Sequence, residues 1–122
     1  MFKISIRQMI IYHHPGCSKS RCALAYLQEQ KHTFEIRNYF TEPFTKLELV
    51  ALLSKLNLSP LAIVRKEELV YKTLIKGKFL SDDAIIDILL NNPKLIQRPI
   101  VEWEANAVVA RPLENLIVEL DK

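Results

Sequence analysis

His13-His14-Pro15-Gly16-Cys17-Ser18-Lys19-Ser20-Arg21 is the stretch from which the fold of this 122-residue chain can be read. It follows the short apolar run 9–12 and leads into residues 22–30, which contain neither glycine nor proline. This order predicts a buried strand, a tight loop marked by Pro15-Gly16, and a helix that begins at or just after Cys17. The sequence therefore places a sulfur atom at the N-terminus of a helix.

The predicted surroundings of Cys17 favour the thiolate over the thiol. The unpaired N–H groups of residues 18–20 and the positive end of the helix dipole both stabilise a negative charge. Four cationic or protonatable side chains lie close by in the sequence: His13, His14, Lys19 and Arg21. The hydroxyl of Ser20, three residues further on, can donate a hydrogen bond to the sulfur. We therefore predict a reactive Cys17 with a lowered pKa, and we prefer this to an inert, buried cysteine.

The composition excludes several classes of protein. With 49% hydrophobic and 25% charged residues, the chain has the make-up of a soluble globular protein. Its net charge of +3 is spread along the sequence, which suits a small anion better than a nucleic acid. No apolar run is long enough to cross a membrane, and Lys3 and Arg7 interrupt any signal-peptide core. We therefore expect a cytoplasmic protein that binds neither nucleic acid nor membrane directly.

The order of the elements predicts the fold class. Residues 1–8 precede a second methionine and are expected to form a leader of uncertain order, and residues 9–122 are expected to form a single domain. The alternating segment 33–39 predicts a second strand, parallel to the first. Helices are expected at 45–56, 59–65, 68–75 and 81–90, a hairpin at 99–103 and 107–109, and a last helix after Pro112. This is an α/β, thioredoxin-like plan: a four-stranded mixed sheet flanked by helices, with a helical insertion between the second and third strands.

Three arginines stand at predicted element boundaries, where side chains often line a cleft. Arg65 lies at the end of the predicted short helix, whereas Arg98 and Arg111 each directly precede a proline at the two ends of the predicted hairpin. For any single arginine a solvated surface charge is the simpler interpretation. Two Arg-Pro pairs on one hairpin favour a binding site, because the planar guanidinium suits a tetrahedral oxyanion.

These motifs together resemble the glutaredoxin-coupled arsenate reductase family, ArsC, whose members have a thioredoxin fold. The resemblance rests on the Cys17 loop, on Val64-Arg65-Lys66, on the run 92–101 with its Arg98-Pro99-Ile100-Val101, and on Arg111-Pro112. The motifs follow the family's order and spacing from Met9 to Leu120.

The resemblance implies a role for each matching position. Cys17 matches the nucleophile that forms a thiol-arsenate adduct, His13 a histidine that helps to hold the thiolate, and Ser20 the hydroxyl bonded to it. The oxyanion-binding positions correspond to Arg65, Arg98 and Arg111, and Pro99 to a cis proline beside the cysteine. The implied substrate is a small oxyanion, most simply arsenate. The implied reductant is glutathione with glutaredoxin as partner, and no bound cofactor is implied.

Other readings of the sequence stay open. Cys22 is expected to pack in the core, with a resolving thiol as the minority interpretation. No metal site is predicted, because the spacing of the histidines and cysteines matches no standard zinc pattern. Two alternative functions remain. One is a redox-sensing regulator of the Spx type, which binds RNA polymerase. Segment 37–43 resembles the corresponding segment of that group of regulators. The other is a glutaredoxin-like protein that forms mixed disulfides with glutathione.

Overall fold

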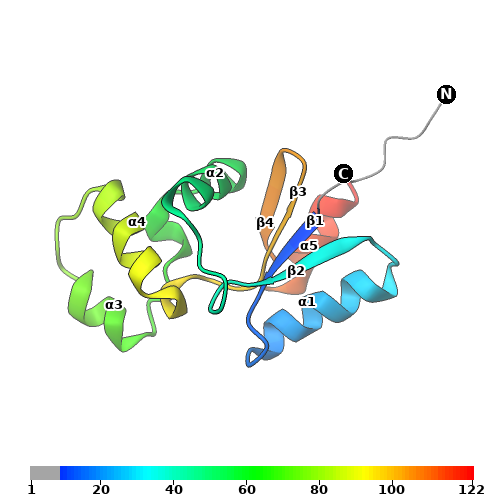
Figure 1. Cartoon of the computed structure of the whole chain (residues 1–122), viewed down its shortest axis with the longest axis horizontal. Coiled ribbons are helices and arrows are strands. Elements are labelled where there is room, and N and C mark those ends of the chain that lie inside the picture. Colours follow the sequence, from blue (N-terminus) through cyan, green and yellow to red (C-terminus); the bar gives the residue numbers. More distant parts are fainter. Residues whose placement is uncertain (1–8) are drawn as a thin grey trace. The chain divides into compact units, whose positions relative to one another are not determined.

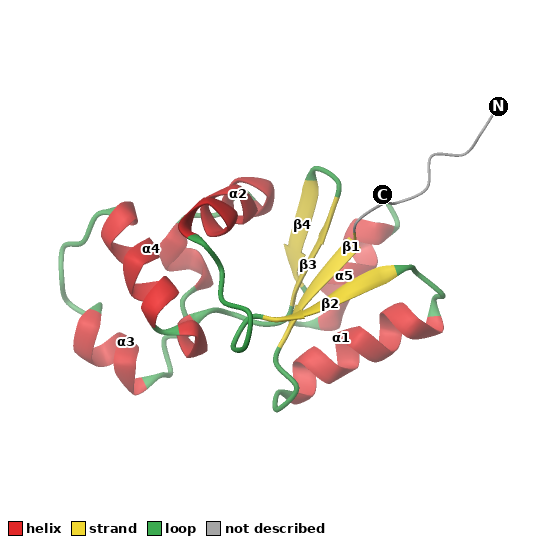
Figure 2. Ribbon diagram, in the orientation of Figure 1, coloured by secondary structure: helices red, strands yellow, loops and turns green. Residues whose placement is uncertain are grey.

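Strand β1 (Met9–His13) is an inner strand of a four-stranded mixed sheet with the order β2-β1-β3-β4. It pairs in parallel with β2 (Phe34–Asn38) and antiparallel with β3 (Ile100–Trp103), which in turn pairs antiparallel with β4 (Asn106–Val109). Figures 1 and 2 show these strands in the computed structural model, which describes residues 9–122. The predicted leader, residues 1–8, lies outside the described residues. The predicted mixed sheet is confirmed.

The described chain forms two compact units. The sheet unit consists of residues 9–38 and 98–122, and the helical unit consists of residues 39–97. The helical unit is inserted between β2 and β3, as predicted. The expectation that residues 9–122 form a single domain stays a prediction.

Two helices cover the sheet within the sheet unit. Helix α1 (Ser18–Glu29) contacts β1, helix α5 (Leu113–Leu120) contacts β4, and the two helices contact each other, so they share one face of the sheet. Alternate residues of β1 and β3 point into the same core because side chains alternate along a strand. The buried members of this core are Met9, Ile11, Ala23, Leu27, Val101, Trp103, Ala110 and Leu116.

Turn and cap residues define the elements of the helical unit. These elements are α2 (Lys46–Leu56), the 3-10 helix η1 (Pro60–Ile63), α3 (Leu69–Leu74), α4 (Asp82–Asn91) and the 3-10 helix η2 (Pro93–Leu95). Thr45 and Glu48 have the sequence spacing of a capping box, and the box is formed at the start of α2: Glu48 N–H donates to Thr45 Oγ1 at 3.1 Å, and Thr45 N–H donates to Glu48 Oε1 at 2.9 Å. Ser81 caps α4 by accepting a hydrogen bond from Ala84 N–H at 3.1 Å.

Two details of the helical unit differ from the sequence expectation. The helix predicted for 59–65 ends at Ile63 as a 3-10 helix, so Arg65 lies outside it. The apolar pattern of α4 predicts Ile85, Ile88, Leu89 and Leu90 as its buried side, but the buried residues are Ile85, Ile86 and Leu89, and Ile88 and Leu90 are half-buried. Residues 85, 86 and 89 form a stripe on one side of an α-helix, as its 3.6-residue period requires.

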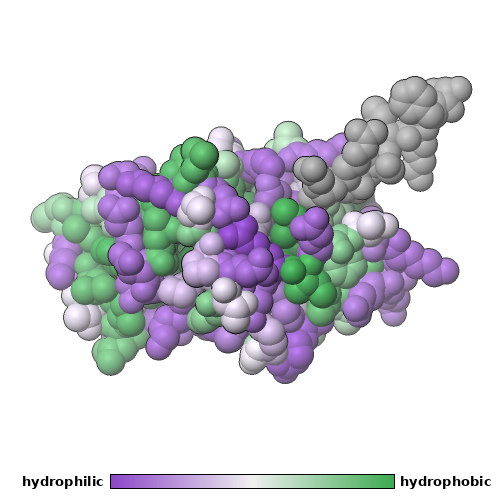
Figure 3. Space-filling model, viewed as in Figure 1, coloured by the Kyte–Doolittle hydropathy of each residue, from purple (hydrophilic) through white to green (hydrophobic). Residues whose placement is uncertain are grey.

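The surface of the helical unit carries apolar side chains among hydrophilic ones (Figure 3). Leu47, Leu69 and Phe79 are among the exposed large hydrophobic residues. Even so, no helix between residues 9 and 122 combines the length and the apolar character that crossing a bilayer needs.

Candidate functional site

The loop between β1 and α1 places Cys17 at the helix start, as predicted. Cys17 is the N-cap residue: its backbone is extended, and its carbonyl oxygen accepts the first helical hydrogen bond from Arg21 N–H at 3.1 Å. A turn precedes it, in which Cys17 N–H donates to the carbonyl of His14 at 2.9 Å. The guanidinium of Arg21 closes the loop by donating to the carbonyl of Pro15 at 2.8 Å. The sulfur is thus held next to the free N–H groups of the first helical turn.

The half-buried Cys17 thiol has a pKa of about 7, which is below the ordinary value for a cysteine. Burial acts against this and raises the pKa, because it penalises the charged form. The N–H groups of Ser20 and Lys19, the side chain of Arg98 and the hydroxyl of Ser20 all donate toward the sulfur and lower the pKa further than burial raises it. The thiol is therefore substantially ionised at neutral pH.

Ser20 connects the sulfur to the loop in front of it. The side chain is fully buried, and its Oγ also accepts a hydrogen bond from His14 N–H at 3.3 Å. Because a hydroxyl both donates and accepts, Ser20 can bond the sulfur and the loop backbone at the same time. The structure thus brings Ser20 to the position that the sequence predicted for it.

The two Arg-Pro pairs place their arginines beside Cys17. Arg98 is buried at the start of β3, and Arg111 Nη1 lies 3.8 Å from Cys17 Sγ and 3.4 Å from the carbonyl oxygen of Arg98. The ends of the hairpin are joined where Ala110 N–H donates to the carbonyl of Pro99 at 2.9 Å. Both Arg-Pro peptide bonds are cis, at Pro99 as the resemblance implied and also at Pro112.

The charge of His13 differs from the sequence expectation, which placed this residue among the cationic or protonatable groups near Cys17. The side chain is buried at the end of β1, and its Nδ1 meets no partner among residues 9–122. Burial lowers the pKa of His13, and the positive charge of Arg21 lowers it further, while a hydrogen bond to the Ser20 backbone acts in the opposite direction. His13 is therefore neutral near pH 7, and its implied role in holding the thiolate stays a prediction.

Arg65 belongs to the helical unit, where two carboxylates contact it. Its Nη1 lies 2.8 Å from Glu68 Oε2, and its Nη2 lies 3.4 Å from Glu67 Oε2. Sequence reasoning missed both carboxylates, although an acid three residues after an arginine in a turn is a recognisable pairing signal. The implied role of Arg65 in binding an oxyanion stays a prediction.

Cys22 is exposed, which contradicts the expectation that it packs in the core. The buried positions of α1 are Ser20, Ala23 and Leu27, and Cys22 falls outside this stripe. Both cysteines are free thiols. Between residues 9 and 122 there is no group of three or more histidine, cysteine or acidic side chains arranged to hold a metal ion.

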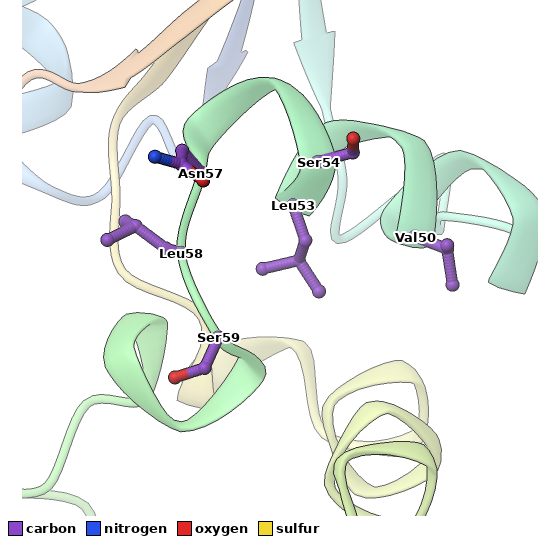
Figure 4. A pocket seen from close by; sticks show the side chains of 6 residues that line it. All are labelled: Val50, Leu53, Ser54, Asn57, Leu58 and Ser59. Atoms are coloured by element: carbon purple, nitrogen blue, oxygen red, sulfur yellow. The ribbon is translucent and has the colours of Figure 1, made fainter.

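A hollow of about 400 Å³ opens on the helical unit and is formed by residues between positions 50 and 59, none of which belongs to the Cys17 loop or to the hairpin. It is lined by Val50, Leu53, Ser54, Asn57, Leu58 and Ser59, and Figure 4 shows Val50 and Leu53 pointing to the same side of α2. None of these side chains titrates near neutral pH. The hollow therefore offers no group that ionises near neutral pH, unlike the Cys17 loop.

The fold and the site together define a thioredoxin-like α/β protein with an ionisable cysteine at a helix N-terminus, next to two arginines. The chain belongs to the ArsC family, whose model matches residues 12–117. This confirms the family suggested by the sequence motifs.

Curated relatives and solved structures carry the same resemblance over most of the chain. An arsenate reductase of Neisseria meningitidis is 38% identical over 108 residues, which is 87% of this chain and 92% of that protein. An arsenate reductase of Escherichia coli K12 is 37% identical over 109 residues, or 88% of this chain and 77% of that protein. The solved structure of an arsenate reductase from Vibrio cholerae has 37% identity and a TM-score of 0.87, covering 94% of this chain and 98% of that one.

Proposed function

We propose that this chain is an arsenate reductase that uses Cys17 as its nucleophile. The observation that carries the proposal is a thiol with a pKa of about 7 that lies 3.8 Å from an arginine donor, in a member of the ArsC family. Arsenate reductases of two bacteria match most of the chain, which supports arsenate as the substrate.

The first step joins the sulfur to arsenic. The Cys17 thiolate attacks the arsenic(V) atom, an S–As bond forms, and one arsenate oxygen leaves as water after it has gained protons. Arg98 and Arg111 bind the remaining oxygens, because guanidinium groups donate paired hydrogen bonds to oxyanions. They also stabilise the negative charge that develops during the attack. Ser20 and the N–H groups of the first helical turn hold the thiolate before it reacts.

The second step transfers two electrons to arsenic. A glutathione thiolate attacks Cys17 Sγ, an S–S bond forms, and the S–As bond breaks with its electron pair remaining on arsenic, which leaves as arsenite. The product on the enzyme is a mixed disulfide between Cys17 and glutathione. Glutaredoxin with a second glutathione then reduces this disulfide and restores the thiol. This cycle suits the cytoplasm, where glutathione keeps thiols reduced.

Two further residues complete the proposal. Arg65 contributes a third guanidinium to oxyanion binding, which its low solvent exposure and its place in the family motif support. His13, kept neutral by burial, fixes the start of the Cys17 loop from the end of β1. No tightly bound cofactor takes part in this scheme, because the two thiols supply both electrons.

A coupled assay tests the proposal directly. Arsenate-dependent consumption of NADPH is followed in the presence of glutathione, glutaredoxin and glutathione reductase. Cys17→Ser should abolish turnover, and Arg98→Ala should lower kcat/KM at least about a hundredfold, because it removes a donor both to the sulfur and to the oxyanion. Arg37→Ala is the matched control, because Arg37 lies over the ring of Tyr12 in the same unit.

Two outcomes would contradict the proposal as a whole, and a third would change only its reductant. If Cys17→Ser and Arg98→Ala both keep wild-type turnover, the catalytic assignment is wrong. If the wild-type protein reduces no arsenate with any thiol donor and instead co-purifies with RNA polymerase, a regulator of the Spx type is the better interpretation. If thioredoxin supports turnover and glutaredoxin does not, the reductase assignment stands and the reductant is wrong.

A further inference from the structure

Arg65 is held in a fixed piece of backbone within the helical unit. Its own N–H donates to the carbonyl of Leu95 at 2.7 Å, directly next to a β-bridge between Val64 and Ile96. A second contact joins the same segments, where Gln97 N–H donates to the carbonyl of Ile63 at 2.8 Å. Backbone hydrogen bonds therefore hold the segment that carries Arg65 on both sides of this bridge.

A tight turn then brings Glu68 to the same side chain. Glu68 N–H donates to the carbonyl of Arg65 at 3.2 Å, which closes a four-residue turn, and Glu68 is also the N-cap residue of α3. The turn places the two side chains together: Glu68 Oε2 accepts from Arg65 Nη1 at 2.8 Å. The Arg65 side chain is 12% exposed and that of Glu68 is 24% exposed, so water screens this pair less than a surface pair.

The contact leaves a particular edge of the guanidinium without a strong partner. Glu68 accepts a hydrogen bond from Nη1, whereas Nε is buried and has no hydrogen-bond partner among the described residues. The remaining nitrogen, Nη2, has only a longer contact of 3.4 Å to Glu67, whose side chain is 59% exposed. Arginine binds oxyanions through two parallel N–H groups, and the Nε–Nη2 edge offers such a pair. A buried N–H without an acceptor is costly, so an incoming oxygen atom at Nε would be stabilised there.

We propose that Glu68 is a positioning residue that holds the Arg65 guanidinium by Nη1 and so presents its Nε–Nη2 edge to the oxyanion substrate. This inference rests on the proposed arsenate reductase function. Glu68 itself touches no substrate, because its carboxylate would repel an oxyanion. Its effect is to fix the rotamer of Arg65, so that less side-chain freedom is lost when the oxyanion binds.

The test compares Glu68→Gln with Glu67→Gln in the full chain. Both substitutions remove one negative charge, at adjacent positions that contact the same guanidinium, but only Glu68 makes the short contact. In the coupled assay, Glu68→Gln should raise the KM for arsenate about tenfold and leave kcat within about twofold, as loss of uniform binding predicts. Glu67→Gln should change both values by less than about twofold.

A second pair of variants separates positioning from a general structural role. In an Arg65→Ala background, the further change Glu68→Gln should have no effect on KM, because the group that Glu68 positions is gone. Glu68→Asp keeps the charge but is one methylene shorter, so its KM should lie between those of the wild type and Glu68→Gln. It also carries the test if thermal unfolding shows that Glu68→Gln does not fold.

The outcomes that overturn the inference are distinct from the failure of the proposed function. If the wild type reduces arsenate and Glu68→Gln keeps the wild-type KM, or lowers it, Glu68 does not position Arg65 for the substrate. The same holds if Glu68→Gln raises KM equally in the presence and absence of Arg65. If the wild type reduces no arsenate at all, the proposed function fails and this inference falls with it.

Discussion

Arg111 Nη1 lies 3.8 Å from the sulfur of Cys17, although the two residues are 94 positions apart in the sequence. The same nitrogen lies 3.4 Å from the carbonyl oxygen of Arg98, which precedes β3. One guanidinium therefore links the loop that carries the nucleophile to the end of the hairpin that carries the other arginine. The planar, forked guanidinium carries further N–H groups, which we expect to bind the oxyanion substrate.

Replacing Arg111 with lysine tests that expectation. Lysine keeps the positive charge but lacks the planar fork, so it cannot bind an oxyanion through two parallel N–H groups while it also contacts the sulfur. We expect Arg111→Lys to lower kcat/KM for arsenate about tenfold to a hundredfold. Arg37→Lys, at a position over the Tyr12 ring, is the control and should change kcat/KM by less than about twofold. Equal values for the two variants would show that charge alone is sufficient at position 111.

The pKa of Cys17 predicts a pH profile for its alkylation. Iodoacetamide reacts with the thiolate, so the rate should rise with pH and level off above a midpoint of about 7. The measurement uses a Cys22→Ser background, because Cys22 is exposed and would also react. A midpoint near that of a free thiol, about 8.5, would mean that the helix N-terminus and its donors do not stabilise the thiolate.

Ser20 and Ser18 offer a matched pair on the first turn of α1. Ser20 is buried and its hydroxyl lowers the pKa of Cys17, whereas Ser18 is exposed. Ser20→Ala should raise the pKa of Cys17, so that alkylation at pH 6 is slower by about threefold or more. Ser18→Ala should leave the rate within about twofold of the wild type. If both variants react at the wild-type rate, the backbone N–H groups suffice to hold the thiolate.

The burial of His13 predicts that the folded protein is less stable in mild acid. Burial lowers the pKa of His13 in the folded chain, so the unfolded chain binds a proton more readily and gains it as the pH falls through about 6.5. The urea midpoint should therefore fall between pH 7.5 and pH 5.5, and it should fall less in His13→Gln, which cannot gain this proton. An equal fall in both proteins would assign the acid sensitivity to other groups.

The site at the helix start was predictable because its signals are local. Pro15-Gly16 ends the strand, the polar run that follows begins a helix, and Cys17 lies between them. The arginines of the hairpin were predictable for a different reason. Each directly precedes a proline at an end of the strand pair, and antiparallel pairing brings those two ends together.

The environment of Cys22 and His13 was not predictable in this way. Residues 22–27 form a nearly continuous apolar run, so the sequence does not fix which side of α1 is buried. Packing against the sheet and α5 determines which side of α1 is buried. Ala23 and Leu27 lie on that side, and Cys22 does not. The charge of His13 likewise depends on burial that only the folded chain imposes. The pairing of Glu68 with Arg65 depends on the tight turn between them, which only the folded chain forms.

A Cys22→Ser variant tests which thiol releases arsenite from the adduct on Cys17. In an α-helix a step of five residues advances about 7.5 Å and turns about 140°, so Cys22 cannot reach the Cys17 sulfur unless the first turn unwinds. We therefore expect Cys22→Ser to keep kcat within about twofold of the wild type in the glutathione-dependent assay. Without glutathione, a single turnover should release no arsenite from either protein, because the second thiol is missing. Arsenite release from the wild type alone, and not from Cys22→Ser, would instead identify Cys22 as an internal resolving thiol.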